Sequence, residues 1–540
     1  MTIEGSPGGG GDAPQDHPQY EHHHGYPPLG HEPPHDGHHH PQVEKGLAGG
    51  SVGLLGGTVL GISSVAPAYA LTATIGLVVA VAGVKMPIIF IAGFIPMFFA
   101  AYAYREFNRV DPDCGTSFTW TTRAFGPYVG WIGGWVAVIA TIIVLANLAG
   151  IGVQFLYQLL GSVFDNPELG DLWQNKPVNV ITCLALVAMA TTVAYRGITT
   201  TEKVQFVLVF FQLAVLAIFV VLAFAKAGGP DDPDGIPFSW DWFNPFTGLT
   251  LSAFVAGLSA SIFSFWGWDT ALTVNEESKD AEKTPGRAAL LCVVSILLTY
   301  LLVSVAALMY AGDGTEGLGL SNEEIQDNVF GALAEPVMGS PWHNLLFLAV
   351  LASSAASLMT TFLPSTRTML GMATYKALPE RFASIHPKYL TPGFGTVVAG
   401  IVAGTFYAVL TFVSEAVLTD TILSLGLMIC FYYGLTAIGC LWFFRKELFT
   451  SFNNFIFKFL FPLMGGIGLW VVFFITVRDS ASPDYDGSGE SIFGFGVVLV
   501  LGVGLILLGV VLMVIWRIRQ PAFFRGETLR PDTPSLIVPE

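Results

Sequence analysis

Charged residues are scarce in this sequence. Only 12% of its 540 residues are Asp, Glu, Lys or Arg, whereas 53% are hydrophobic. Soluble proteins carry about 25% charged residues, so a globule in water would leave much of this apolar surface uncovered. The lipid bilayer is the solvent that suits such a composition, and we expect an integral membrane protein.

Several features of enzymes and nucleic-acid-binding proteins are also missing. The five cysteines have neither the spacing of a metal site nor that of a disulfide framework. We find no phosphate-binding glycine loop, no nucleophile beside a recognisable base and no basic surface for nucleic acid. A cleavable signal peptide is not visible either. These absences argue against an enzyme, a bound cofactor or metal, and a nucleic-acid partner.

Residues 1–45 have a composition unlike that of the rest of the chain. They are rich in Gly, Pro, His and Asp, and they hold nine of the eleven histidines. A segment with so few apolar residues cannot form a core, so we expect a disordered tail. The histidine clusters at 22–24 and 38–40 leave two interpretations open, a solvated tail and a transition-metal site.

Long apolar runs occupy the remainder of the chain. About 20 apolar residues span the hydrocarbon core as a helix, and the sequence contains twelve such runs. The fold class predicted is therefore an all-α membrane protein of twelve transmembrane helices. The helices are expected near 51–80, 86–108, 128–158, 178–195, 204–225, 250–276, 288–311, 343–372, 394–413, 417–444, 455–477 and 492–516.

The basic residues of the loops predict the orientation. With twelve helices both chain ends lie on one side, and 20 of the 24 Lys and Arg residues fall on that side. The exceptions are Lys85, Lys176, Lys226 and Arg478. Because positive loops stay inside, we expect cytoplasmic termini and a multi-pass protein of the plasma membrane. The loops of the other side are acidic and account for much of the net charge of −16.

Two of the predicted helices contain an interruption. The first has two serines followed by Val65, Ala66 and Pro67, and proline removes a backbone donor and clashes with the preceding turn. The sixth has Gly267 between bulky aromatic residues, two positions before Asp269. Either interruption taken alone could be a kink or a packing site.

The positions of the two interruptions favour a binding site. They lie five helices apart, and a repeat of five helices must be inverted relative to its partner. Paired breaks in inverted halves indicate a site at mid-membrane. A broken helix presents amide donors at one end, which suit a carboxylate, and carbonyl acceptors at the other, which suit an ammonium group. An amphoteric solute such as an amino acid fits both ends.

Four stretches resemble one known family of transporters. They are 61–72 (GISSVAPAYALT), 115–135 with Phe-Gly-Pro before two Gly-Trp pairs, 263–287 (FSFWGWDTALTVNEESKDAEKTPGR) and 365–392 with Leu-Pro and His-Pro-Lys-Tyr. In order and spacing they are similar to the amino acid–polyamine–organocation permeases over residues 47–445.

The resemblance implies a fold and a domain organisation. It implies a core of five plus five inverted helices, with two further helices at the end, and alternating access to a central site. The domains expected are the tail 1–45, a first repeat over 46–230, a second repeat over 231–446, two helices over 447–518 and a cytoplasmic C-terminal tail over 519–540.

The resemblance also implies site residues. Backbone groups of the first break would meet a substrate carboxylate, and the sixth helix would offer carbonyls and aromatic walls to an amine. The residues concerned are Ser63, Ser64, Val65 and Ala66 in the first helix, and Phe263, Ser264, Phe265, Trp266 and Gly267 in the sixth.

Asp269 falls where many family members have an acidic residue. A buried carboxylate in a membrane is a candidate for amine recognition or proton handling, and a capping or gating hydrogen bond is the alternative. The chain also departs from the family. Val65 replaces a common glycine, and Gln212, which cannot titrate, is aligned near the lysine that some proton-coupled members carry.

Further polar residues lie at membrane depth. Ser353, Ser354 and Ser357 are close to where related folds hold sodium, although such hydroxyls often serve packing. Asn147 and Tyr432 are candidates for lining the pocket, with hydrogen bonding between helices as the alternative.

The sequence thus predicts a secondary active transporter, a symporter or an exchanger. Its partners would be an amino acid or related amine, a coupling ion (H⁺ or Na⁺) and the bilayer. The alternatives are a permease for polyamines or other organic cations, and a channel or solute sensor on the same scaffold.

Overall fold

The computed structural model describes residues 45–229, 235–413, 417–486 and 489–533, without the side chains of 198–202 and 486. The tail predicted over 1–45 lies outside these residues, apart from Lys45. So do the metal interpretation of the histidine clusters and the predicted repeat boundary at 230/231.

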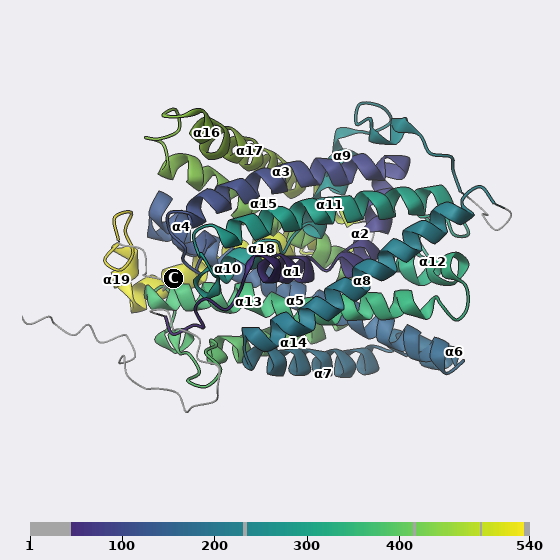
Figure 1. The fold of residues 1–540 in the computed structure, drawn as a ribbon, viewed down its shortest axis with the longest axis horizontal. Coiled ribbons are helices and arrows are strands. Elements are labelled where there is room, and N and C mark those ends of the chain that lie inside the picture. Colours follow the sequence, from purple (N-terminus) through teal and green to yellow (C-terminus); the bar gives the residue numbers. More distant parts are fainter. Residues whose placement is uncertain (1–44, 230–234, 414–416, 487–488, 534–540) are drawn as a thin grey trace, which may run out of the picture. The chain divides into compact units, whose positions relative to one another are not determined.

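The described chain is almost entirely helical (Figure 1). The first half contains α1 (Leu54–Val65), α2 (Pro67–Ala82), α3 (Met86–Asn108), α4 (Ser117–Phe125), α5 (Pro127–Val163), α6 (Pro167–Gly170), α7 (Lys176–Tyr195) and α8 (Ile198–Lys226). The second contains α9 (Leu251–Ser264), α10 (Thr270–Thr273), α11 (Thr284–Ala311), α12 (Val329–Met338), α13 (Asn344–Thr374), α14 (Gly393–Val413), α15 (Val417–Phe443), α16 (Phe452–Asn454), α17 (Phe461–Asp479), α18 (Val497–Arg519) and α19 (Pro521–Phe524).

Shorter pieces connect these helices. They are the short 3₁₀-helices η1 (Gly83–Lys85), η2 (Asp171–Gln174), η3 (Trp240–Phe243), η4 (Asn275–Glu277), η5 (Gln326–Asn328), η6 (Glu380–Ala383) and η8 (Pro483–Asp486), and the π-helix η7 (Phe455–Leu460). The strands β1 (Ser491–Ile492) and β2 (Phe495–Gly496) form an antiparallel hairpin.

Ten helical stretches of the described chain are long and apolar enough to cross a membrane. One of them runs through α1, α2 and α3, and α9 is a shorter apolar helix. The prediction of a mainly helical membrane protein is confirmed, and most helix positions agree to within several residues. The number of twelve crossings stays a prediction. Pattern alone missed α4 and α12, which are too short to look like membrane spans.

The core is built around two long helices. α13 packs along α5, and α1, α2, α8 and α14 also lie against α13. α15 packs against α17, α5 and α9. Glycines allow the closest approaches: a Cβ at Gly134 of α5 would lie 3.0 Å from the sulfur of Met372 in α13.

The loops gather at two ends of these helices. We call one the terminal face, formed by residues 45–53, 109–116, 275–283, 375–392 and 520–533. Backbone hydrogen bonds join its parts, since the amides of Ser51 and Val52 both donate to the carbonyl oxygen of Glu277. The opposite face holds 83–85, 240–250 and 312–328. There the Lys85 ammonium binds Asp241 and Thr247, and the bond to Lys85 lowers the pKa of Asp241.

Candidate functional site

The first predicted interruption is confirmed. α1 ends at Val65, Ala66 adopts a left-handed conformation with φ of 55°, and α2 begins at Pro67. Proline lacks an amide hydrogen, but the first position of a helix does not need one. Pro67 can therefore begin α2, although it cannot continue α1. The amide of Ala66 donates to the carbonyl oxygen of Ile62, which leaves carbonyls rather than amides free at the end of α1.

The second interruption is confirmed as well. α9 ends at Ser264 and α10 begins only at Thr270, with Gly267 between them at φ of 110°. A Cβ at Gly267 would lie 2.9 Å from the carbonyl carbon of Ser64 and from the nitrogen of Val65. The two breaks therefore touch each other, although Ser64 and Gly267 are 203 positions apart in the sequence. The hydroxyl of Thr270 adds a second link by donating to the Ser64 hydroxyl at 2.8 Å.

Hydroxyl groups of α13 join both halves of the broken first helix. Ser357 donates to the carbonyl oxygen of Ser64 at 2.8 Å, and the amide of Tyr69 in α2 donates to the Ser353 hydroxyl at 3.2 Å. The hydroxyl of Ser354 is buried and has no hydrogen-bond partner among the described residues. The structure thus brings Ser353 and Ser357 to the break, where both hydrogen bond to backbone groups, whereas Ser354 lies against Gly152 of α5.

A glutamine that the sequence analysis did not single out lies beside the first break. Gln205 of α8 accepts from the Ser63 hydroxyl at 2.6 Å and donates to the carbonyl oxygen of Ala356 at 3.1 Å. It thereby links α1 to α13. Gln212, two turns further along α8, is fully buried, and its amide has no partner among the described residues. That Gln212 matches the lysine of some proton-coupled family members stays a prediction.

Aromatic rings form one wall of the site. The hydroxyl of Tyr300 in α11 donates to the carbonyl oxygen of Ser264 at 2.6 Å. Its ring packs on Phe265 at 5.1 Å between centroids, and Phe265 contacts Phe94 of α3. Phe263, one of the predicted aromatic wall residues, is 4% exposed and therefore buried among its neighbours.

Asp269 lies beside tyrosines and a tryptophan. It is 5% exposed, and its Oδ1 atom has no hydrogen-bond partner among the described residues. Its carboxylate interacts electrostatically with Tyr104 of α3 and with Tyr432 and Tyr433 of α15. Trp268 packs against Tyr433 at 4.9 Å between ring centroids. A buried carboxylate in this aromatic surrounding is suited to a cation or to a proton.

The two candidates for pocket lining have different positions. Tyr432 accepts from the indole nitrogen of Trp266 at 2.5 Å, which ties α15 to the second break. Asn147 of α5 accepts from Thr421 of α15 at 2.8 Å, a hydrogen bond between helices. The structure therefore brings Tyr432 to the break and gives Asn147 the helix-linking contact that was its alternative.

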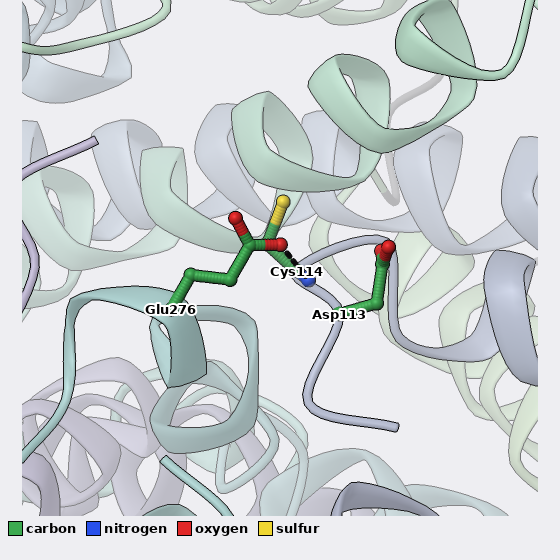
Figure 2. Close-up of side chains that lie close together, drawn as sticks. All are labelled: Asp113, Cys114 and Glu276. Atoms are coloured by element: carbon green, nitrogen blue, oxygen red, sulfur yellow. Dashed lines mark hydrogen bonds between the residues drawn. The ribbon is translucent and has the colours of Figure 1, made fainter. Parts of the chain in front are cut away.

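A cluster of buried charged and thiol side chains lies at the terminal face. Asp113, Cys114 and Glu276 each place one ligand atom within 4.8 Å of the others (Figure 2). Such a set could hold a metal ion, but the ammonium group of Lys45 already meets it. Lys45 Nζ lies 2.9 Å from Asp113 Oδ2, 2.6 Å from Glu276 Oε1 and 3.6 Å from Cys114 Sγ.

Charge and burial compete in this cluster, and all its members are outside the long helices. Burial disfavours each charge, yet Asp113 and Glu276 keep the pKa of Lys45 well above its usual range. Despite burial, Lys45 and the hydroxyl of Tyr375 keep the pKa of Asp113 below its usual value. The pKa of Glu276 is raised, because burial and the nearby Asp113 outweigh the effect of Lys45.

A second buried ion pair lies beside the first. Arg367 of α13 donates from Nε and Nη2 to the two carboxylate oxygens of Glu277, at 3.1 and 3.0 Å. Both side chains are almost fully buried. Glu106 pairs with Arg105 and Arg109, and the partner of Glu276 is Lys45.

The site residues that sequence reasoning missed have something in common. Gln205, Tyr300, Thr270 and Lys45 make their decisive contacts with residues far away in the chain. A buried amide in a membrane helix was a usable signal for Gln205. Lys45 was assigned to the tail by composition, and no local pattern marks it.

The fold and the sequence were compared with known proteins. The crystal structure of MhsT in complex with L-phenylalanine shares the fold, with a TM-score of 0.55 and 13% identity over 77% of this chain and 98% of that chain. The branched-chain amino acid permease BcaP of Lactococcus lactis is 23% identical over 339 residues, 60% of this chain and 69% of the permease.

Two further relatives come from Escherichia coli. The low-affinity putrescine importer PlaP is 24% identical over 413 residues, 74% of this chain and 83% of the importer. The putative arginine/ornithine antiporter is 28% identical over 299 residues, 52% of this chain and 58% of the antiporter. This chain thus spans less than two thirds of the antiporter.

Most of the chain matches one protein family. The sequence matches the amino acid permeases from residue 50 to residue 515, a stretch that includes both interrupted helices and the ion pair of Arg367 with Glu277. The protein is therefore a member of the amino acid permease family of membrane transporters.

Proposed function

We propose that the protein is a secondary active transporter of amino acids or related amines that works by alternating access. The observation that carries this proposal is the contact between the two broken helices at Gly267 and Ser64. Each break releases backbone groups into the interior of the protein, where they can bind a solute that has shed its water.

The chemistry of the breaks supports a zwitterion as substrate. The C-terminal end of α1 carries free carbonyls and a partial negative charge, which suit an ammonium group. The N-terminal end of α2 carries a partial positive charge, and the amide of Ala68 in its first turn has no intrahelical acceptor. We assign the ammonium to carbonyls of residues 63–65 and of the second break, and the carboxylate to the start of α2. Phe263, Phe265 and Trp266 would enclose the side chain.

The ion pairs of Lys45 and Arg367 support a state closed at the terminal face. We propose that this face is cytoplasmic, since the basic residues of the loops lie mainly there. Opening would then require Lys45 to leave Asp113 and Glu276. This arrangement agrees with a transporter that admits solute from one side at a time.

A second candidate substrate is an organic cation such as a polyamine. The observation that favours it is the buried Asp269 oxygen without a partner among the described residues, next to three tyrosines. A second amino group of the substrate could bind there. A transporter for neutral amino acids would instead keep Asp269 protonated or use it for a proton.

Uptake by proteoliposomes tests both candidates. The full-length protein is reconstituted, and uptake of labelled amino acids and polyamines is measured while proton and sodium gradients are varied independently. We expect saturable uptake without nucleotide. The absence of uptake for the whole panel would refute the proposal, and sustained single-channel conductance would favour a channel.

The Asp269→Asn variant separates the two substrates in the same assay. If Asp269 binds a second amino group, polyamine uptake should fall while uptake of neutral amino acids is retained. If Asp269 handles a proton, the dependence on the proton gradient should disappear for every substrate. Unchanged rates and an unchanged response to pH would exclude both roles.

A further inference from the structure

The C-terminal segment 520–533, which contains α19, belongs to the terminal face and packs against the helix ends there (Figure 1). Phe523, Phe524 and Leu529 are at most 5% exposed. They share an apolar cluster with Phe118 of α4, Trp131 of α5, and Met372, Tyr375 and Ala377 at the end of α13. Residues 520–533 of the predicted C-terminal tail are thus part of the packed protein.

Hydrogen bonds fasten the segment at two places. The hydroxyl of Thr528 donates to the carbonyl oxygen of Tyr375 at 2.6 Å. Arg123 of α4 donates from Nη1 to the carbonyl oxygens of Arg530 and Thr533, at 3.1 and 2.6 Å. Arg123 also forms an ion pair with Asp111, with Nε 2.6 Å from Oδ2.

Tyr375 and Arg123, the residues that bind the segment, also support the cluster of Lys45, Asp113, Cys114 and Glu276, which we call the Lys45 cluster. The hydroxyl of Tyr375 donates to Asp113 Oδ2 at 2.7 Å, the same oxygen that binds Lys45. Lys45 Nζ also lies 5.8 Å from the centre of the Tyr375 ring. Asp111, held by Arg123, precedes Asp113 by two residues in the same loop. The segment therefore supports, through Tyr375 and Arg123, the carboxylate that receives Lys45.

We propose that residues 520–533 act as a latch that stabilises the closed terminal face and loosens before this face opens. The proposal rests on the proposed alternating access. A docked segment stabilises only those conformations in which its partners keep their positions. While it is bound, Tyr375 and Arg123 are fixed and Asp113 stays in place for Lys45. When it leaves, the ion pair loses this support and the open state becomes more populated.

Cys114 provides a direct measure of opening. Its thiol is fully buried and lies at the Lys45 cluster, so alkylation requires the terminal face to open. Burial also raises the pKa of this thiol, which keeps it unreactive in the closed state. The experiment measures the rate at which N-ethylmaleimide labels Cys114 in the purified full-length protein, with the site identified by mass spectrometry of its peptide.

The double variant Phe523→Ala/Leu529→Ala removes two of the buried anchors. We expect Cys114 to be labelled about tenfold faster than in the wild type, a change typical of coupled sites. Arg525→Ala is the matched control in the same segment, because Arg525 is exposed and its ion pair among the described residues is with Glu527. Its labelling rate should equal that of the wild type. Equal rates for the double variant and the wild type would overturn the latch.

Two further measurements keep the test decisive. Cys430 is buried in α15, and parallel acceleration at Cys430 would indicate general loosening and count against the latch. If the double variant does not fold, Thr528→Val removes only the bond to Tyr375. It should accelerate labelling of Cys114 about threefold, as expected for one hydrogen bond, and an unchanged rate would refute the proposal.

The labelling experiment is independent of the proposed substrate, since it needs no solute. Faster labelling of Cys114 without uptake of any amino acid or amine would leave the latch intact and refute the proposed function. Uptake of an amino acid, together with an unchanged rate of Cys114 labelling in the double variant, would support the proposed function and refute the latch.

Discussion

Gly267 in the second break lies directly against the backbone of Ser64 in the first. A Cβ at position 267 would be 2.9 Å from the Ser64 carbonyl carbon, closer than side chains approach backbone atoms in proteins. The two interrupted helices can touch because this position has no side chain, and the site depends on that contact.

The substitution Gly267→Ala should therefore abolish or strongly reduce transport. The new methyl group would push the two breaks apart, and the φ of 110° would strain an alanine by about 1–3 kcal/mol. Uptake by proteoliposomes measures the effect. Gly339→Ala is the control, because Gly339 also has a positive φ of 72° but no atom within 4 Å of its Cβ position. Equal uptake by the two variants would show that the contact is unimportant.

The substitution Lys45→Met should destabilise the protein in a pH-dependent way. It leaves Asp113 and Glu276 buried without their counter-charge, a loss of about 3–5 kcal/mol. In the variant the pKa values of both carboxyl groups should rise above their unfolded values. Such groups favour folding at low pH, and this contribution is lost as the pH rises through the folded pKa.

The melting temperature of the Lys45→Met variant, measured from about pH 5 to about pH 8, tests this sign. The deficit relative to the wild type should be small at the acidic end and large at the alkaline end. Lys283→Met serves as the control, because the pair between Lys283 and Asp280 is half exposed and should contribute little. A deficit independent of pH would contradict the proposed charge pairing.

The two glutamines of α8 form a natural pair for comparison. Gln205→Leu removes the link between Ser63 and Ala356 and leaves their polar groups without this partner, so transport should fall about tenfold. Gln212→Leu removes a buried amide without a partner among the described residues, so it should leave stability unchanged or raise it. Initial rates of uptake and melting temperatures check both. The opposite ranking would refute the roles that these contacts assign to the two glutamines.

The buried pair of Arg367 and Glu277 should behave non-additively. Glu277→Gln leaves the guanidinium group without its charge partner and should cost about 3–5 kcal/mol. The double variant Arg367→Met/Glu277→Leu should be more stable than either Arg367→Met or Glu277→Gln, because no uncompensated charge remains. Thermal melting in detergent gives the ranking. Additive losses would mean that the two residues act separately.

The helix breaks could be predicted because their causes are local. Pro67 stops a helix through its own ring, and Gly267 permits a positive φ through its own lack of a side chain. Helix positions followed from apolar runs for the same reason. The resemblance of short stretches to a family was confirmed by the match over residues 50–515.

The contacts around the breaks could not be predicted from local patterns. Ser63 and Gln205 are 142 residues apart, and Lys45 and Glu276 are 231 residues apart. Nothing in a single sequence fixes the register between such distant helices. The roles of the substrate-binding residues, of Asp269 and of the α13 serines stay predictions, which the experiments above address.

The position of Lys45 has a practical consequence for protein engineering. Composition places the border between tail and membrane domain directly after this residue, so a truncation designed to remove the histidine-rich segment would delete it. The shortened protein would retain its helices but lose the cation that joins Asp113 to Glu276. Truncations and fusions should therefore begin upstream of Lys45, and tags should be separated from it by several residues.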